Sequence, residues 1–228
     1  MYTKRGILFW ESFGVAIIVL ANLVTASINP IGIPVVSTPI CVGIAIAATF
    51  YGSGAHLNPV VTGLITIFAK LRWSRIFLYL AAAFGSAGLI CGAWRIGQVA
   101  ISLPVFTLEQ TDLSAVIAKE ALATLCLLSY LSVFIFLERG IFTVAAVPVF
   151  LSVLQLTALG GADMNPAVAF GWFVVGKYDA PALGAHLIGE AIAIGAFLIV
   201  GHGLRTWRRQ VVANRHEAFR NQDYGNSR

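Results

Sequence analysis

Two short segments of this 228-residue chain begin with the same dipeptide, an asparagine followed by a proline. Asn58-Pro59 opens the apolar stretch 59–69, and Asn165-Pro166 opens the apolar stretch 166–176. Asparagine is a good helix N-cap and proline is favoured at the first helical position, so each dipeptide predicts a helix start. At about 1.5 Å per residue, each stretch covers roughly half of a hydrocarbon core about 30 Å thick. We therefore interpret both stretches as half-helices that enter a membrane without crossing it.

One such dipeptide would indicate only a helix start, but two copies place two side-chain amides and two positive helix ends at one depth. The amides can donate hydrogen bonds to a passing oxygen, and the converging positive ends form a barrier to cations and protons. Non-helical backbone at membrane depth is tolerated only where it is buried in protein or lines a water-filled path. The paired motifs therefore favour a narrow pathway for neutral, hydrogen-bonding solutes.

The composition indicates a polytopic, all-α membrane protein. Hydrophobic residues make up 58% of the chain and charged residues 11%, whereas a soluble domain carries roughly 25% charge. No Asp, Glu, Lys or Arg occurs from Ser12 to Ala69, which argues against a soluble enzyme, a disordered chain or a nucleic-acid-binding domain. A spanning helix needs about 20 apolar residues. Six segments meet that need approximately and are predicted to span the membrane: 6–28, 35–52, 75–97, 114–137, 141–159 and 181–203.

The two motifs occupy matching positions in an internal repeat. Glu11 precedes Asn58 by 47 positions, and Glu120 precedes Asn165 by 45. Each half contains three spans and one half-helix, so the second half is inverted relative to the first. We predict a channel domain over 1–204, with repeat one at about 6–97 and repeat two at about 114–203. The polar segment 205–228 is predicted to be a basic, mostly disordered cytosolic tail.

The distribution of charge predicts the orientation of the chain. With six spans, 12 of the 15 Lys and Arg residues fall on one side of the membrane. By the positive-inside rule this places both termini in the cytoplasm, with attraction to anionic lipid and no nucleic-acid partner. The three cysteines lie in apolar runs without metal-ligand spacing, and we expect no metal, no cofactor and no catalytic residues.

The segment Ser53-Gly54-Ala55-His56-Leu57-Asn58-Pro59 resembles the first re-entrant motif of the aquaporins, or major intrinsic proteins, with Val60 where alanine is usual. Asn165-Pro166-Ala167 resembles their second motif in full. The resemblance covers about 1–204 and implies six transmembrane helices plus two re-entrant half-helices. It also implies a multi-pass homotetramer in the cell membrane, with one passive pore for water or small neutral solutes in each protomer.

The resemblance also implies roles for three buried polar residues. Glu11 and Glu120 stand where the family carries a glutamate in the first and fourth helices, and each is expected to hold loop backbone rather than solute. His56 belongs to the first motif and is expected to orient the loop.

The sequence departs from the family pattern at the outer filter, because Val168 stands where an arginine usually follows the second motif. By rough alignment the other filter positions are Val42, Val153 and Ala162. Such a filter would be apolar and comparatively wide, which favours glycerol, urea, undissociated metalloid acids, peroxide or dissolved gas over a strictly water-selective pore. An apolar ring can also gate by dewetting, so slow water flow is compatible with this filter.

Several readings stay open at this point. Asp163 is expected to hydrogen-bond loop amides, although it could draw cations to the outer vestibule. Glu190 is expected to pair with His186, four residues earlier on the same helix face. Gln155 could line the pore or bond between helices. A non-conducting membrane protein with an aquaporin-like fold and an adhesive or structural role is the alternative to a channel.

Overall fold

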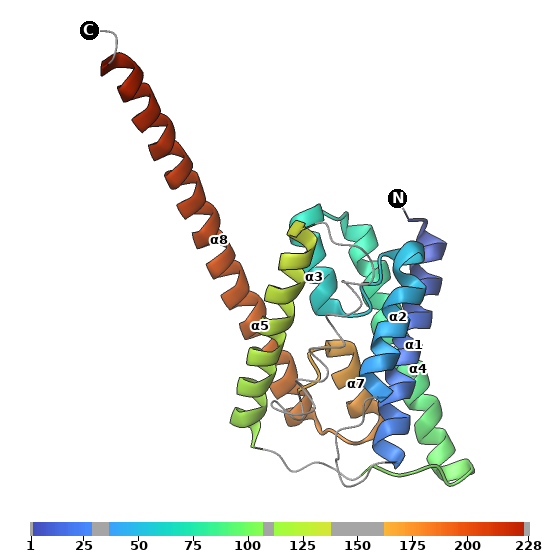
Figure 1. Cartoon of the computed structure of the whole chain (residues 1–228). Helices are drawn as coiled ribbons and strands as arrows, with labels where there is room; N and C mark the ends of the chain where they lie inside the picture. The colour runs from blue at the N-terminus through green and yellow to red at the C-terminus, as the bar shows by residue number, and fades with distance from the viewer. Residues whose placement is uncertain (1, 29–36, 107–111, 138–161, 226–228) are drawn as a thin grey trace.

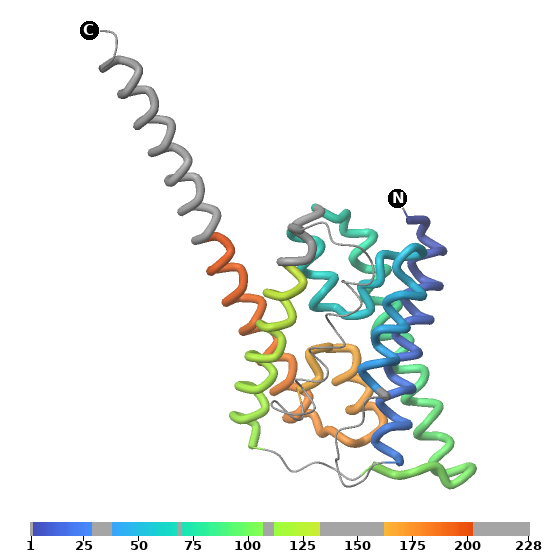
Figure 2. Tube along the Cα trace, in the orientation of Figure 1, coloured from blue at the N-terminus to red at the C-terminus, as the bar shows by residue number. Residues whose placement is uncertain are grey.

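The computed structural model describes residues 2–28, 37–106, 112–137 and 162–225, with side chains except at 37, 68–69, 133–137 and 203–225 (Figure 2). All regular elements in these ranges are helices. In chain order they are α1 (Lys4–Ile28), α2 (Ser37–Ser53), α3 (Pro59–Ala69), α4 (Trp73–Ala100), α5 (Leu113–Leu137), α7 (Pro166–Val175) and α8 (Ala180–Gly225).

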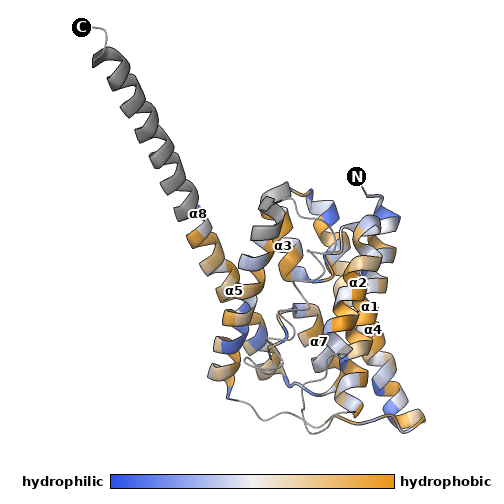
Figure 3. Cartoon of the chain, in the orientation of Figure 1, coloured by the Kyte–Doolittle hydropathy of each residue, from blue (hydrophilic) through white to orange (hydrophobic). Residues whose placement is uncertain are grey.

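The helices form two groups with the half-helices between them. α1 packs against α2 and α4, and α5 packs against α8. Figure 1 shows α3 and α7 one above the other between these groups, each at a different level of the molecule. Apolar residues run along the helices of both groups, as Figure 3 shows. Four helices are long and apolar enough to cross a membrane within the described residues: Lys4–Ile28, Trp73–Ala100, Leu113–Ser132 and Ala180–His202.

Each half-helix contributes to an apolar cluster that includes residues of the other repeat. The larger apolar cluster joins α7, through Ala167, Val168 and Trp172, to residues of α1, α2 and α4. The smaller cluster joins α3, through Val60 and Leu64, to residues of α5 and to the loop before α7. Because the clusters cross the repeat boundary, the two repeats interlock rather than lying side by side.

The observed helices match the predicted ones with two exceptions. Five predicted spans and both half-helices correspond to helices of the structure, and the predicted span 141–159 lies outside the described residues. The second exception is the tail, because α8 continues to Gly225 where we expected a mostly disordered segment from 205 onward. The correction has a local cause: no glycine or proline interrupts residues 204–224, and Arg, Gln, Ala and Leu there favour helix.

Candidate solute pathway at the two Asn-Pro motifs

Each motif asparagine caps the half-helix that follows it. The Val60 N–H donates to Asn58 Oδ1 at 2.8 Å, and the Ala167 N–H donates to Asn165 Oδ1 at 3.1 Å. The prolines occupy the first helical positions of α3 and α7, where the missing N–H costs nothing. The local sequence therefore folds as its residue types predict.

The same two side chains bond the motifs to each other. Asn58 Nδ2 donates to the carbonyl oxygen of Met164 at 2.6 Å, and Asn165 Nδ2 donates to the carbonyl oxygen of Leu57 at 3.1 Å. The bonds are reciprocal, because each amide donates to the residue directly before the opposite asparagine. The N-termini of α3 and α7 therefore meet, which concentrates two positive helix ends, each worth about half a charge, at one place.

Left-handed backbone before each asparagine directs those carbonyl groups. Leu57 has φ 50° and Met164 has φ 52°, a conformation that costs a non-glycine residue roughly 1–2 kcal/mol. Glu11 holds the first turn, since its carboxylate accepts from Leu57 N at 2.6 Å and His56 N at 3.0 Å. Ser53 Oγ donates to the same carboxylate at 2.6 Å.

Glu120 does the same for the second turn. Its carboxylate accepts hydrogen bonds from Met164 N and, at 2.8 Å, from Asp163 N. A third partner is His186 Nδ1, at 2.9 Å. Glu11 and Glu120 are 1% and 0% exposed, so each carboxylate depends on these protein donors in place of water. Both glutamates thus maintain the backbone that faces the opposite motif.

His56 lies behind the first loop rather than between the motifs. Its ring stacks on Tyr79 with centroids 3.8 Å apart, and its Nδ1 lies 3.2 Å from Thr62 Oγ1. Tyr79 adds a contact that sequence reasoning missed, because its hydroxyl donates to the Ser53 carbonyl at 2.5 Å. Tyr79 and Ser53 are 26 residues apart in the sequence, so no local sequence pattern predicts this contact.

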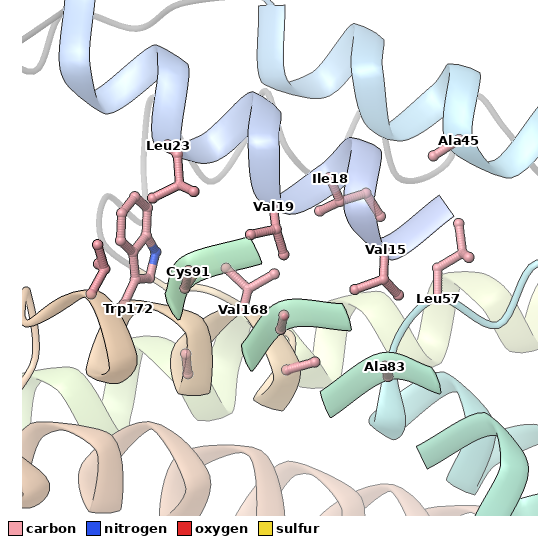
Figure 4. Packing of buried hydrophobic residues seen from close by; sticks show 14 of the residues in the cluster. Val15, Ile18, Val19, Leu23, Ala45, Leu57, Ala83, Cys91, Val168 and Trp172 are labelled. Carbon is pink, nitrogen blue, oxygen red and sulfur yellow. The ribbon is translucent and has the colours of Figure 1, made fainter. Parts of the chain in front are cut away.

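Val168, which directly follows the second motif, lies in an apolar environment. Its side chain is 6% exposed and faces Val19 of α1 (Figure 4). A small cavity beside it is lined by Val19, Asn22, Leu23, Cys91, Val168 and Trp172. Val42 packs against the same apolar cluster. Ala162 belongs to the smaller cluster with Met164, and Val153 and Gln155 lie outside the described residues.

One predicted pairing is wrong. His186 bonds to Glu120 and lies 3.6 Å from Asp163 Oδ2, while neither oxygen of Glu190 has a hydrogen-bond partner among the described residues. The i, i+4 spacing places Glu190 and His186 on one helix face, but the packing of α5 against α8 brings the Glu120 carboxylate within 2.9 Å of the imidazole instead. Among the described residues Asp163 Oδ2 has no hydrogen-bond partner, and the Asp163 N–H donates to Glu120.

Comparison with known proteins identifies a family and several relatives to which this chain is similar. A model of the major intrinsic protein family matches residues 6–180. The chain is 28% identical over 205 residues to a probable NIP-type aquaporin of Nicotiana alata, covering 82% of this chain and 74% of that protein. It is 28% identical over 146 residues to the probable aquaporin TIP4-1 of Oryza sativa subsp. japonica, covering 60% of this chain and 57% of the relative.

Among solved structures, the X-ray structure of the aquaglyceroporin from Plasmodium falciparum is similar with a TM-score of 0.62 and 18% sequence identity. The match covers 86% of this chain and 94% of that one. At this identity the likeness concerns the fold alone, whereas the family match includes both Asn-Pro motifs and well over half of the chain. The chain therefore belongs to the major intrinsic protein family, the multi-pass membrane channels for water or small solutes.

Proposed function

We propose that this chain is a passive channel for water and/or small neutral solutes, with glycerol, urea, undissociated metalloid acids, peroxide or gases favoured over strict selectivity for water. The observation that carries the proposal is the apolar, buried Val168 directly after the second motif. An arginine there would supply positive charge and several donors and would occupy more volume. Valine supplies none of these, so the pathway beside it is wider and less polar.

The proposed solute contacts begin with the motif asparagines. A side-chain amide has two N–H groups, and Asn58 and Asn165 each use one of them for the opposite loop. The second N–H of each amide is assigned to solute oxygens. Val42, Val153, Ala162 and Val168 are assigned to the outer filter, with support from the packing of Val42 and Val168 on one cluster.

The assembly and orientation follow from the same proposal. Residues 1–204 form the channel of each protomer in a homotetramer of the cell membrane, and both termini lie in the cytoplasm. Large apolar side chains exposed on α1, among them Phe9, Phe13 and Leu20, require lipid or neighbouring protomers around the helix. The Lys and Arg residues near the termini supply the positive-inside signal.

Stopped-flow light scattering on proteoliposomes tests the function with a water gradient and then a glycerol gradient. We expect glycerol re-swelling well above that of empty vesicles. Fast water shrinkage without glycerol entry would mean a tighter filter than proposed. Absence of both fluxes would shift the conclusion to the non-conducting alternative or to gases and metalloid acids.

The substitution Val168→Arg tests the filter directly. We expect it to suppress glycerol entry about tenfold or more, because the guanidinium adds bulk and charge at the constriction. Val105→Arg is the matched control, since Val105 is 73% exposed in the loop after α4. Unchanged glycerol flux in Val168→Arg would refute the filter assignment.

A further inference from the structure

The two repeats hold their loops in chemically different ways. Among the described residues, Glu11 receives neutral donors, namely two backbone N–H groups and the Ser53 hydroxyl. Glu120 instead lies in a cluster of ionisable side chains with Asp163, His186 and Glu190. We call these four residues the α5–α8 acid cluster. Nothing in the family motif accounts for this asymmetry.

Glu190 is the unexplained member of the α5–α8 acid cluster. It is 2% exposed, and within the part of the chain that the structure describes neither of its oxygens has a hydrogen-bond partner. It nevertheless lies on the face of α8 that meets α5, because it follows His186, which bonds Glu120, by one helical turn and directly follows Gly189, which packs against Glu120 Cβ. Two carboxylates are acceptors only, so this approach becomes a hydrogen bond only when one of them carries a proton.

The charges around Glu190 leave a negative excess. Among the described residues, α5 contributes Glu120, the loop before α7 contributes Asp163, and α8 contributes His186. Lys177 acts electrostatically on Asp163, and its ammonium lies over the Trp172 ring, 4.5 Å from the ring centroid. Tyr178 bonds Asp163 and stacks on His186 with centroids 4.6 Å apart.

Even a charged imidazole would therefore face three buried carboxylates. An unpaired buried charge costs several kcal/mol, and ionisable groups avoid that cost by neutralising. No group of three or more His, Cys, Asp and Glu residues in the described part of the chain has the arrangement of a metal site. A proton is thus the ligand that the α5–α8 acid cluster accommodates.

We propose that Glu190 is a proton-binding site: at neutral pH its carboxyl group is protonated and donates a hydrogen bond to Glu120. Release of this proton to water at alkaline pH leaves two facing carboxylates that repel each other. The two helices are already in close contact beside this pair: an added Cβ at Gly189 of α8 would lie 2.7 Å from Glu120 Cβ of α5. The repulsion therefore acts at short range and moves Glu120.

Two hydrogen bonds connect Glu120 to the proposed solute pathway, so a displacement of Glu120 is expected to affect that pathway. Glu120 holds Met164 N, and the Met164 carbonyl accepts from Asn58 across the pathway. Loss of the Glu190 proton is therefore expected to disorder the second loop and to lower solute flux. Beside Glu11 the described residues of the first repeat contribute no second carboxylate, so we expect the response to originate in the second repeat.

Infrared difference spectroscopy of the full-length protein in proteoliposomes tests the proton directly. We expect a carbonyl band of a buried protonated carboxylic acid at neutral pH, its loss at alkaline pH, and its absence in Glu190→Gln. Asp112→Asn is the control, because Asp112 is an exposed carboxylate that caps the start of α5 through Ser114 and is not a member of the cluster. Absence of the band in the wild type, or its persistence in Glu190→Gln, would overturn the proposal.

A flux titration tests the consequence. Wild-type flux is expected to fall severalfold between neutral and alkaline pH, whereas Glu190→Gln keeps its neutral-pH flux because the amide still donates to Glu120 and cannot ionise. An equal alkaline loss in Glu190→Gln would refute the link between the site and the loop. The flux arm rests on the proposed function, but the infrared arm is independent of the solute, so the two failures are distinguishable.

Discussion

At the scale of single residues, each motif asparagine uses its side-chain oxygen as a hydrogen-bond acceptor and its side-chain nitrogen as a donor. Asn165 Oδ1 caps α7, while Asn165 Nδ2 faces the opposite loop. Asn165→Asp preserves the cap, because aspartate is an equally good N-cap, but removes both N–H donors. A lost donor worth about 1–1.5 kcal/mol changes a rate about tenfold. We expect neutral-solute flux to fall by about that factor and the exclusion of cations to weaken, as measured by stopped-flow scattering and a vesicle ion-flux assay.

The control for this exchange is Gln98→Glu. Gln98 Nε2 donates to the Pro104 carbonyl at 2.8 Å near the exposed end of α4, so the same change of amide to carboxylate occurs away from the pathway. Flux through Gln98→Glu should equal that of the wild type. If Asn165→Asp also conducted at the wild-type rate, the asparagine amide would not be a solute contact.

Residue types predicted the local half of the candidate site and not its tertiary half. The N-caps followed from asparagine and proline chemistry, and the loop-holding glutamates followed from the family resemblance. The partner of His186 could not be predicted, because the choice between Glu190 and Glu120 depends on how closely α5 and α8 approach. The left-handed turns at Leu57 and Met164 were equally hidden, since neither residue type favours φ near 50°.

At the scale of elements, the contact between α5 and α8 depends on one glycine. A Cβ at Gly189 would lie 2.7 Å from both Glu120 Cβ and the Ile117 carbonyl oxygen, which is rigid backbone. Gly189→Ala is therefore expected to destabilise the protein by about 1–3 kcal/mol, as overpacked sites do. Thermal unfolding in detergent should show a lower midpoint.

Gly195→Ala is the matched control on the same helix. A Cβ there meets nothing within 4 Å, so removing the conformational freedom of glycine should leave stability unchanged or raise it by up to about 1 kcal/mol. Equal midpoints for Gly189→Ala and Gly195→Ala would show that close approach at Gly189 does not hold the two helices.

Element existence was easier to predict than element ends. The half-helices were found because proline and asparagine mark their starts, and the spans because charge is excluded from them. The end of the last helix was not found, since composition suggested disorder where helix propensity without a breaker extends α8 to Gly225. Polarity alone therefore does not end a helix that emerges from a membrane.

At the scale of the whole molecule, the distribution of charge makes a prediction about sidedness. Thr3 and Val105 are both exposed, one beside the N-terminus and the other after α4. In a background without Cys41, Cys91 and Cys126, Val105→Cys should react with a membrane-impermeant maleimide in intact cells. Thr3→Cys should react only after permeabilisation, and the reverse pattern would contradict a cytoplasmic N-terminus.

The reciprocal bonds between the two motifs also constrain how the chain is made. In the first motif, the Asn58 amide and the Leu57 carbonyl have partners that lie 106 and 108 residues later in the chain, and a ribosome adds about 5–20 residues per second. The first re-entrant segment therefore emerges roughly 5–20 s before the partner that completes it. During that interval its loop must be kept from lipid by other means, so biogenesis of this protein requires a holding step that a simple succession of spanning helices does not.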